Sequence, residues 1–360
     1  MFQNIYKNKK VLIIGHTGFK GSWLAIWLLN LGAKISGYSL PYKLNKGHLD
    51  KKTLNKISHY EGDVRDYDKL LRSIKKIQPE IIFHLAAQAL VKKSYKDPIN
   101  TFETNMIGTV NVLNSIRNVN SIKAAVIITS DKVYKNVNKK EGYKENDILE
   151  GSDPYSASKS CAEIISKSYI NSYFKNKEKF VCVARAGNVI GGGDWSDDRI
   201  VPDVVKSVIK KKGLIIRSPN ATRPWQHVLE PLSAYLLIGK ELLKRNKKIN
   251  GHSFNVGPNF RKFYTVKNIL DRFKLDFKTL SWRTIKNKEL KEANLLHLNS
   301  NKIKKFIKWK STLSFEQTVQ FTSKWYLNFL KNKKNNINYS LQQIDLYKSI
   351  ALKNKNYFLF

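Results

Sequence analysis

A glycine-rich turn at residues 15–21 constrains the fold of this chain more than any other feature. The turn reads Gly15-His16-Thr17-Gly18-Phe19-Lys20-Gly21; the apolar run Val11–Ile14 precedes it and the apolar-periodic segment Ser22–Leu31 follows it. Glycines permit positive φ angles and a close approach of the backbone to a ligand, and the unpaired N–H groups at a helix start attract pyrophosphate. The order of strand, glycine turn and helix predicts a dinucleotide-binding unit.

Short apolar runs continue to alternate with amphipathic stretches through the first half of the chain. Strands are predicted at Val11–Ile14, Lys34–Tyr38, Ile81–Leu85, Ala125–Thr129 and Phe180–Arg185, and helices at Ser22–Leu31, Asp68–Ile77, Asn105–Arg117 and Tyr155–Phe174. This alternation is typical of βα units on a parallel sheet. We therefore expect an α/β fold, a Rossmann-type doubly wound parallel sheet, with a smaller C-terminal substrate-binding region.

The alternation becomes irregular after about residue 186, where a glycine triplet, several prolines and aromatic-arginine segments appear. We expect a dinucleotide-binding domain over residues 1–186 that includes the catalytic helix described below. Residues 187–330 should form mainly a substrate-binding region, with some segments returning to the sheet. Residues 331–360 should form a C-terminal tail.

The segment Asp153-Pro154-Tyr155-Ser156-Ala157-Ser158-Lys159 carries the strongest chemical signal. Asp suits a helix N-cap and Pro the first helical position, so the tyrosine and the lysine fall in the opening turns. Their i, i+4 spacing places both on one helix face. A nearby ammonium favours the phenolate, so we expect Lys159 to lower the pKa of Tyr155 from about 10 and make it a base for an alcohol proton.

A second polar group, Ser130-Asp131-Lys132, follows the strand predicted at Ala125–Thr129. Carboxyl ends of parallel strands meet at one edge of a sheet, which is where doubly wound proteins bind their ligands. The position of the Tyr-x-x-x-Lys segment after this strand end makes that segment a more specific signal than it is alone.

Taken together, the GxxGxxG spacing and the Tyr-x-x-x-Lys segment resemble the extended short-chain dehydrogenase/reductase family. The resemblance implies that Asp63 contacts the adenine of a bound dinucleotide and that Ser130 hydrogen-bonds the reacting oxygen. The cofactor-binding set that it implies is Gly15, Thr17, Gly18, Phe19, Gly21, Asp63, Val64, Leu85, Ala86, Ala87, Tyr155 and Lys159. His84, near the end of the strand predicted at Ile81–Leu85, is interpreted as a structural histidine.

The choice between NAD and NADP stays open from the residues alone. The end of the second strand, Gly37-Tyr38-Ser39-Leu40, offers no acidic residue for a ribose 2′-hydroxyl and no Arg for a 2′-phosphate. A narrower resemblance favours NAD.

Four segments together resemble the CDP-glucose 4,6-dehydratases over residues 8 to 325. They are Gly15–Leu24, Thr129–Tyr134, Ala184–Trp195 and Arg223–Leu232. The resemblance implies that CDP-glucose is the substrate and that Asn188 and Arg223 bind its sugar diphosphate. Arg199 is either a third such residue or a partner in a surface salt bridge, and Trp195 and Trp225 either shape the nucleotide pocket or fill the core. The resemblance also implies a homodimer joined through the helices that begin near residues 105 and 155.

The reaction implied by this resemblance is an internal redox elimination in deoxysugar synthesis of the O-antigen type, which supplies lipopolysaccharide. Tyr155 removes the O4 proton while hydride leaves C4, the resulting 4-ketone acidifies the C5 proton, and the enone formed by loss of water takes the hydride back at C6. The elimination needs an acid at O6 and a base at C5, and Asp131 and Lys132 are the candidates. The related dTDP-glucose dehydratases carry Thr-Asp-Glu here, so Lys132 is a departure: it is the base, or a charge that steadies the enolate, or only a partner of Asp131.

Other readings of the chain remain. A related 4-epimerase, or a dehydratase for another base, would share most of these motifs. A non-catalytic NAD-binding regulatory protein with a basic face for nucleic acid would need none of Tyr155, Lys159 and Asp131.

The net charge of +37 invites that nucleic-acid reading, because a basic surface attracts phosphates regardless of sequence. Arg, however, makes up only eleven of the 65 basic residues, and the lysines alternate with Asn and Ile along the whole chain. AT-rich codons encode all three residues, so we attribute the charge to codon bias and expect no nucleic-acid partner. A basic surface would still steer a diphosphate compound toward the site.

The lengths of the apolar runs and the spacing of the cysteines indicate where in the cell the protein is located. No apolar run approaches the length of about 20 residues that spans a bilayer, and the N-terminus does not resemble a signal peptide. The two cysteines, Cys161 and Cys182, lack metal-ligand spacing. We expect a cytoplasmic protein with no membrane contact and no metal site.

Overall fold

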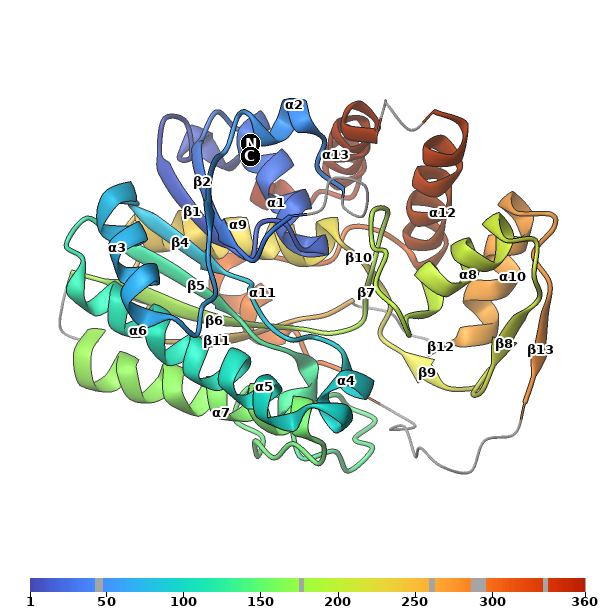
Figure 1. The fold of residues 1–360 in the computed structure, drawn as a ribbon, viewed down its shortest axis with the longest axis horizontal. Helices are drawn as coiled ribbons and strands as arrows, with labels where there is room; N and C mark the ends of the chain where they lie inside the picture. The colour runs from blue at the N-terminus through green and yellow to red at the C-terminus, as the bar shows by residue number, and fades with distance from the viewer. Residues whose placement is uncertain (43–47, 175–177, 259–262, 286–295, 333–335, 360) are drawn as a thin grey trace.

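The centre of the molecule is a seven-stranded parallel sheet (Figure 1). The computed structural model describes residues 1–42, 48–174, 178–258, 263–285, 296–332 and 336–359. In the spatial order β11-β6-β5-β4-β1-β2-β3, every neighbouring pair of strands is parallel. The strands are β1 (Lys10–Ile14), β2 (Lys34–Ser39), β3 (Ser58–Glu61), β4 (Ile81–His84), β5 (Ala124–Ile128), β6 (Phe180–Ala186) and β11 (Ser253–Val256). The strand order reverses between β1 and β4, which is the point where doubly wound sheets bind ligands.

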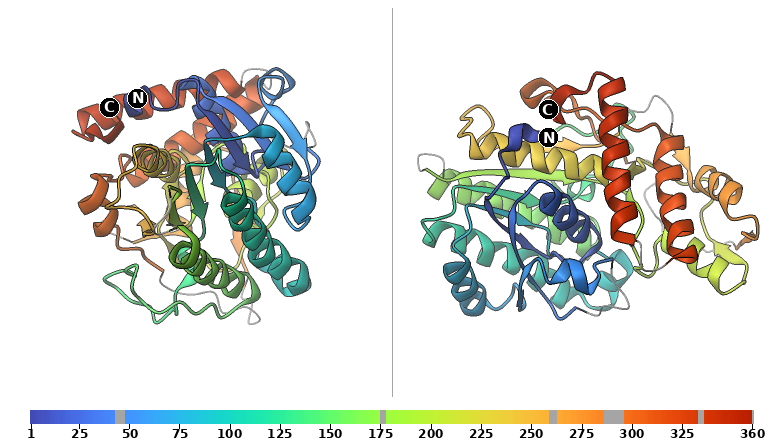
Figure 2. Two further views of the ribbon diagram at one scale, coloured as in Figure 1. Left: turned by 90° about the vertical axis from the view of Figure 1, so that its left-hand side faces the viewer. Right: turned by 90° about the horizontal axis from the view of Figure 1, so that it is seen from above.

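Helices cover both faces of this sheet (Figures 1 and 2). One face packs against α1 (Phe19–Asn30) and α9 (Leu229–Leu243), and the other against α3 (Tyr67–Ile77), α6 (Gly108–Asn118) and α7 (Pro154–Tyr169). Side chains of a strand point alternately to the two faces, so Val11 and Ile13 join one apolar cluster while Leu12 and Ile14 join the other. The expected doubly wound architecture is confirmed.

Local signals in the sequence account for most helix boundaries. The Asp153 side chain accepts a hydrogen bond from the Ser156 N–H and caps α7, with Pro154 in the first turn. Asp66 caps α3 in the same way, through the Lys69 N–H. The helix α1 begins earlier than predicted, at Phe19, because Gly18 serves as its N-cap.

A smaller group of elements lies beyond the carboxyl ends of the strands, at the right of Figure 1. It contains α8 (Ile200–Ile209), β8 (Leu214–Ile216), β9 (Thr222–Arg223), β12 (Tyr264–Thr265), α10 (Val266–Asp276) and β13 (Trp282–Thr284). Between β9 and β12 in the sequence, α9 packs on one face of the main sheet and β11 is one of its strands. The division at residues 186 and 330 stays a prediction.

The remaining elements complete the described part of the chain. They are η1 (Phe2–Asn4), α2 (Lys51–Leu54), α4 (Val91–Lys96), α5 (Pro98–Phe102), η3 (Glu103–Ile107), η4 (Asp131–Val133), η5 (Ile170–Phe174), β7 (Val189–Ile190), β10 (Gln226–His227), α11 (Asn301–Ile307), α12 (Phe315–Lys331), α13 (Asn336–Lys353) and η7 (Tyr357–Leu359).

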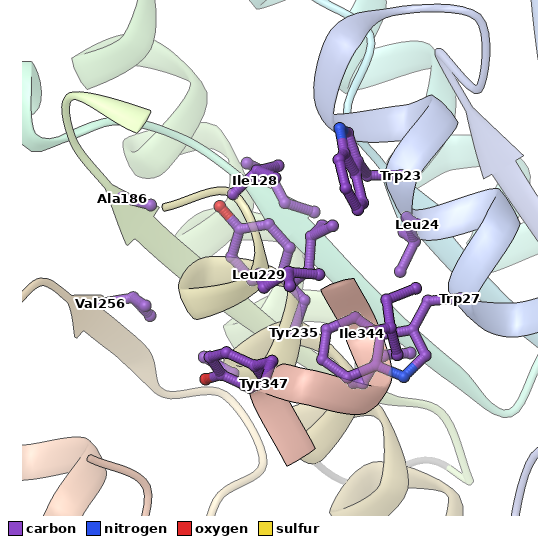
Figure 3. Packing of buried hydrophobic residues seen from close by; sticks show 14 of the residues in the cluster. Trp23, Leu24, Trp27, Ile128, Ala186, Leu229, Tyr235, Val256, Ile344 and Tyr347 are labelled. Atoms are coloured by element: carbon purple, nitrogen blue, oxygen red, sulfur yellow. The ribbon is translucent and has the colours of Figure 1, made fainter. Parts of the chain in front are cut away.

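The C-terminal tail is part of the main apolar core. Helix α13 packs on α1, where the Tyr347 ring lies edge-on to Trp27 with 5.9 Å between centroids (Figure 3). Ile344 and Tyr347 are fully buried. None of the helices in the described ranges combines the length and the apolar character needed to cross a membrane.

Candidate active site

The glycine turn after β1 forms a cradle with two positions, Gly15 and Gly21, that only glycine can occupy. Gly15 has a φ angle of 92°, and a Cβ atom there would lie 2.7 Å from the Ala86 nitrogen. A Cβ atom on Gly21 would lie 2.1 Å from the Gly15 carbonyl oxygen. Since no side chain caps α1 at Gly18, its first N–H groups are available to an anion. Thr17 and Phe19 are half-buried at the rim of this turn. The cradle fits the pyrophosphate of a dinucleotide.

Asp63 and Val64 lie at the far end of this cleft, after β3. The Asp63 carboxylate accepts from the Arg65 guanidinium at 2.7 Å, and this partner lowers the pKa of Asp63. Asp63 and Arg65 line an open cavity of about 460 Å³ together with Asp66, Glu103 and Ile107. The adenine contact proposed for Asp63 is compatible with this opening and stays a prediction.

The predicted residues Leu85, Ala86 and Ala87 follow β4 directly beside the glycine turn. The N–H groups of Leu85 and Ala86 both donate to the Ile14 carbonyl, at 2.8 and 2.9 Å. This fixes the loop against the end of β1, so backbone rather than side chains lines this part of the cleft.

Tyr155 and Lys159 lie in the first two turns of α7, and both are buried. The Lys159 ammonium donates to the Ile128 carbonyl oxygen at 3.4 Å, which places it at the end of β5. Burial lowers the pKa of Lys159 to about 8, while the charge of Glu163 acts in the opposite direction.

The expected lowering of the Tyr155 pKa is wrong for the free protein. Burial raises the pKa of Tyr155, and among the groups that lower it are the Ser130 hydroxyl and Arg199 rather than Lys159. The spacing argument counted the charge of Lys159 and missed the free-energy cost of burying a phenolate.

Ser130 and Asp131 meet at the end of β5, as expected. The Ser130 hydroxyl donates to Asp131 Oδ1 at 3.0 Å and caps the short helix η4. The other carboxylate oxygen, Oδ2, is buried with no partner among the residues that the structure describes. Gly187 makes room for it: a Cβ atom there would lie 1.9 Å from this oxygen. Burial raises the pKa of Asp131, while the charge of Lys132 and the Ser130 hydroxyl act in the opposite direction.

Lys132 is half-buried in η4 and donates its backbone N–H to the Ser130 hydroxyl at 3.3 Å. Its ammonium forms no ion pair with Asp131 or any other residue of the described ranges. The charge of Lys132 still acts on Asp131 and lowers its pKa, so the three alternatives for Lys132 stay predictions.

The three residues predicted to bind the sugar diphosphate lie on separate elements. Arg199, at the N-cap of α8, pairs with Asp194 at 3.1 Å, and its charge also acts on Tyr155. The charge of Arg223, on β9, acts on Asp131. Asn188 follows β6 with a φ angle of 30°, and its carbonyl accepts from the Gln226 N–H. Arg199 thus makes a salt bridge, and its part in substrate binding stays a prediction.

Two residues of the cleft escaped the sequence analysis. Lys20 Nζ lies 5.9 Å from the centre of the Tyr235 ring. Burial and the charge of Lys159 lower the pKa of Lys20 to about 7. The Tyr235 hydroxyl is fully buried without a partner in the described part of the chain, and points toward Ile128 and Ala186 at the ends of β5 and β6 (Figure 3). The sequence did contain a signal for Lys20, because this lysine lies inside a glycine-rich turn and the helix that follows is apolar.

His84, interpreted as structural, and the two tryptophans whose roles were left open all make contacts inside the fold. Burial lowers the pKa of His84 to about 3, and its Nε2 lies 3.3 Å from the Thr109 hydroxyl. The Trp195 ring packs on Tyr326 and Phe329. The Trp225 indole donates to the Tyr264 carbonyl. Across the described ranges, no group of three or more metal-ligating side chains comes together.

A family model and individual relatives match this chain along most of its length. The model described as GDP-mannose 4,6 dehydratase matches residues 12–322. The CDP-glucose 4,6-dehydratase of Salmonella typhimurium strain LT2 is 40% identical over 339 residues, which cover 92% of this chain and 94% of that protein.

Solved structures share the fold at lower identity. The epimerase Mth375 of Methanothermobacter thermautotrophicus superposes with a TM-score of 0.79 at 20% identity, covering 92% of this chain and 95% of that one. The dTDP-glucose 4,6-dehydratase of Bacillus anthracis, in complex with NAD, has a TM-score of 0.73 at 24% identity, with coverage of 90% and 97%. The family model and the 40% identical relative each cover most of this chain, and together they show its family. The chain belongs to the GDP-mannose 4,6 dehydratase family, within the extended short-chain dehydrogenases/reductases.

Proposed function

We propose that the protein is a CDP-glucose 4,6-dehydratase that converts CDP-D-glucose to CDP-4-keto-6-deoxy-D-glucose and water. The observation that carries the proposal is the buried Asp131 carboxyl, with one oxygen unpartnered, beside Ser130 and the Tyr155-Lys159 helix. An alcohol oxidation alone needs only Ser130, Tyr155 and Lys159. A protonated acid next to them supplies what an elimination adds. The 40% identity to the CDP-glucose 4,6-dehydratase of Salmonella typhimurium supports the same substrate.

The cofactor in this proposal is NAD, which supplies a reversible hydride acceptor when bound. The glycine turn with Thr17 and Phe19 would hold its pyrophosphate, and Asp63 with Val64 its adenosine. The backbone of Leu85, Ala86 and Ala87 would line the nicotinamide half. The cradle that excludes a Cβ atom at Gly15 and Gly21 supports this assignment.

The chain's own residues then divide the proton transfers among themselves. Ser130 orients the O4 hydroxyl of the sugar, Tyr155 takes its proton, and Lys159 holds the phenolate by its charge. Asp131 donates its proton to O6, so that the 6-hydroxyl leaves as water. Lys132 takes the C5 proton in our assignment. The raised pKa of Asp131 supports the acid role, because only a protonated carboxyl can donate.

Arg199, Arg223 and Asn188 would bind the sugar diphosphate at the side of the smaller region. Planar guanidinium groups donate paired hydrogen bonds to phosphate oxygens, which suits them to this task. The action of Arg199 on Tyr155 and of Arg223 on Asp131 supports their placement around the sugar rather than on a remote surface.

A homodimer is part of this proposal. Large apolar side chains are exposed along α4, α5, η3 and α7: Tyr95, Ile99, Ile107 and Ile164. They extend over the helices through which the family resemblance predicts pairing. We further propose that the enzyme is cytoplasmic and supplies a deoxysugar for a lipopolysaccharide of the O-antigen type.

The test is turnover of four nucleotide hexoses in the presence of NAD. CDP-, dTDP-, UDP- and GDP-hexoses would be incubated separately, and the 4-keto product measured by the near-ultraviolet absorbance it develops in alkali. A site that hydrogen-bonds a polar group rejects an analogue lacking it by up to about 10⁴–10⁵-fold, so a large preference for CDP-glucose is expected. Equal kcat/KM for CDP- and dTDP-glucose would refute the CDP assignment. A C4-epimerised hexose as the product would favour a 4-epimerase.

A further inference from the structure

Glu163 continues the face of α7 that carries Tyr155 and Lys159, one turn further along the helix. Its carboxylate is saturated with hydrogen bonds. Oε1 accepts from the Thr129 hydroxyl at 2.5 Å and from Arg185 Nε at 2.9 Å. Oε2 accepts from Arg185 Nη2 at 2.9 Å and from the Ser253 hydroxyl at 3.1 Å. One side chain therefore joins α7 to the ends of β5 and β6 and to β11.

The Glu163–Arg185 pair is buried although it borders open space. The side chains of Arg185 and Glu163 are only 4% and 2% exposed. They form part of the wall of a cavity of about 530 Å³ that Lys167 and Lys302 also line, behind the catalytic helix and away from the glycine turn. A buried ion pair rarely adds net stability over an apolar pair of the same shape, so its presence calls for another role.

Glu163 is also a carboxylate whose charge acts on Lys159. The charged or titratable groups around the Lys159 ammonium are His84 from β4, Lys20 from α1, and Tyr155 and Glu163 from its own helix. Burial and Lys20 favour loss of the ammonium proton, while His84 is neutral. The only hydrogen bond of this ammonium to a described residue is the long one to the Ile128 carbonyl.

We propose that Glu163 is a positioning residue that clamps Thr129, and with it Ser130, against the catalytic helix and keeps Lys159 protonated. Thr129 directly precedes Ser130, so the hydrogen bond from its hydroxyl to Glu163 sets the distance between the strand end and the helix. Arg185 holds the carboxylate in place with both branches of its guanidinium. The inference rests on the proposed dehydratase function, because Lys159 matters there as the charge beside Tyr155.

The test compares the pH dependence of kcat/KM for CDP-glucose among the wild type and three variants. Glu163→Gln removes the charge and leaves Arg185 unpaired, and Glu163→Gln/Arg185→Met removes both charges. Lys159 must be protonated to act, so activity falls as the pH rises through its pKa. Glu163 lies one helix turn from Lys159. Without its charge, the alkaline limb of the profile, where kcat/KM falls, should lie about one pH unit lower in the double variant and lower still in Glu163→Gln. Glu230→Gln is the matched control: it alters another buried glutamate, which binds Tyr347 and the Thr312 and Leu313 N–H groups. Glu230→Gln should change the melting temperature of the protein and leave the alkaline limb of the pH profile at its wild-type position.

A second readout separates this inference from the proposed function. The pKa of Lys159 can be followed directly by NMR of isotope-labelled lysine side chains, assigned by the signal missing in Lys159→Arg. A lower Lys159 pKa in both Glu163 variants would support the positioning role even if CDP-glucose is not turned over. An unchanged Lys159 pKa together with an unchanged alkaline limb would overturn it and leave the pair as part of the fold alone.

Discussion

A single methyl group at Gly187 should disable the acid of the site while sparing its oxidation chemistry. In Gly187→Ala the new Cβ atom would lie 1.9 Å from Asp131 Oδ2 and 2.3 Å from its Cγ. Ordinary contact begins at about 3.4 Å, so the Asp131 carboxyl must move by about 1.5 Å. A misplacement of about 1 Å can reduce a reaction by about 10²-fold. We therefore expect elimination to fall at least that far.

The assay separates the two halves of the reaction. The three atoms nearest to the new methyl group all belong to Asp131, so C4 oxidation should continue and enzyme-bound NADH should accumulate with CDP-glucose, while formation of the 4-keto-6-deoxy product slows. Asp131→Asn should give the same pattern. Gly213→Ala is the control, because a Cβ atom there meets only the Ser281 hydroxyl at 3.6 Å. Normal product formation by Gly187→Ala would refute the acid role of Asp131; loss of NADH formation as well would mean that the methyl group disrupts the whole site.

Three further predictions address other groups. Tyr155→Phe should reduce turnover by about 10²–10⁴-fold with NAD and CDP-glucose binding retained, as measured by calorimetry; near-normal turnover would contradict the assignment. Lys132→Met should keep C4 oxidation, accumulate NADH and lose C5 deuterium exchange by about 10²-fold or more; exchange at the wild-type rate would return Lys132 to a structural role. Burial raises the pKa of Glu230 from 4.5 to about 7, so its contribution to stability is present below pH 4.5 and is lost as the pH rises through 7. The melting temperature of Glu230→Gln relative to the wild type should therefore rise across that window, and a constant difference would contradict the shift.

Features that depend on neighbours in sequence were predictable. The glycine turn, the capped start of α7 and the i, i+4 pair of Tyr155 and Lys159 are set by a few consecutive residues, and each is where the sequence placed it. The alternation of apolar runs was enough to predict the parallel sheet, because strands buried on both faces must be apolar throughout. Even the error at the start of α1 is local: Gly18 ends the turn and caps the helix at once.

Features that depend on distant segments were not predictable from patterns. Gly187 looks like one more glycine of a loop until β6 places it against Asp131 from β5. Lys20 sits in the cofactor turn, but its environment is set by Tyr235 on α9 and by Lys159 on α7. The wrong direction for the Tyr155 pKa has the same origin, because burial is a property of the assembled site. Spacing identifies which groups can meet, whereas the packed fold determines how much solvent they lose.

The proposed reaction requires two neighbouring acids to behave in opposite ways. Asp131 must hold its proton until it is needed at O6, and Tyr155 must be deprotonated so that it can take the proton from O4. Burial alone raises the pKa of both groups, so it would keep both protonated. What distinguishes them is the arrangement of cations: Tyr155 shares a helix face with Lys159, whose own proton Glu163 helps to retain. The charges of Lys132 and Arg223 act on Asp131 against the effect of burial, and both side chains would be engaged by substrate in the proposed complex. In the proposed complex, helix α7 would supply the charge that favours the phenolate, and Gly187 leaves only enough room for the buried Asp131 carboxyl.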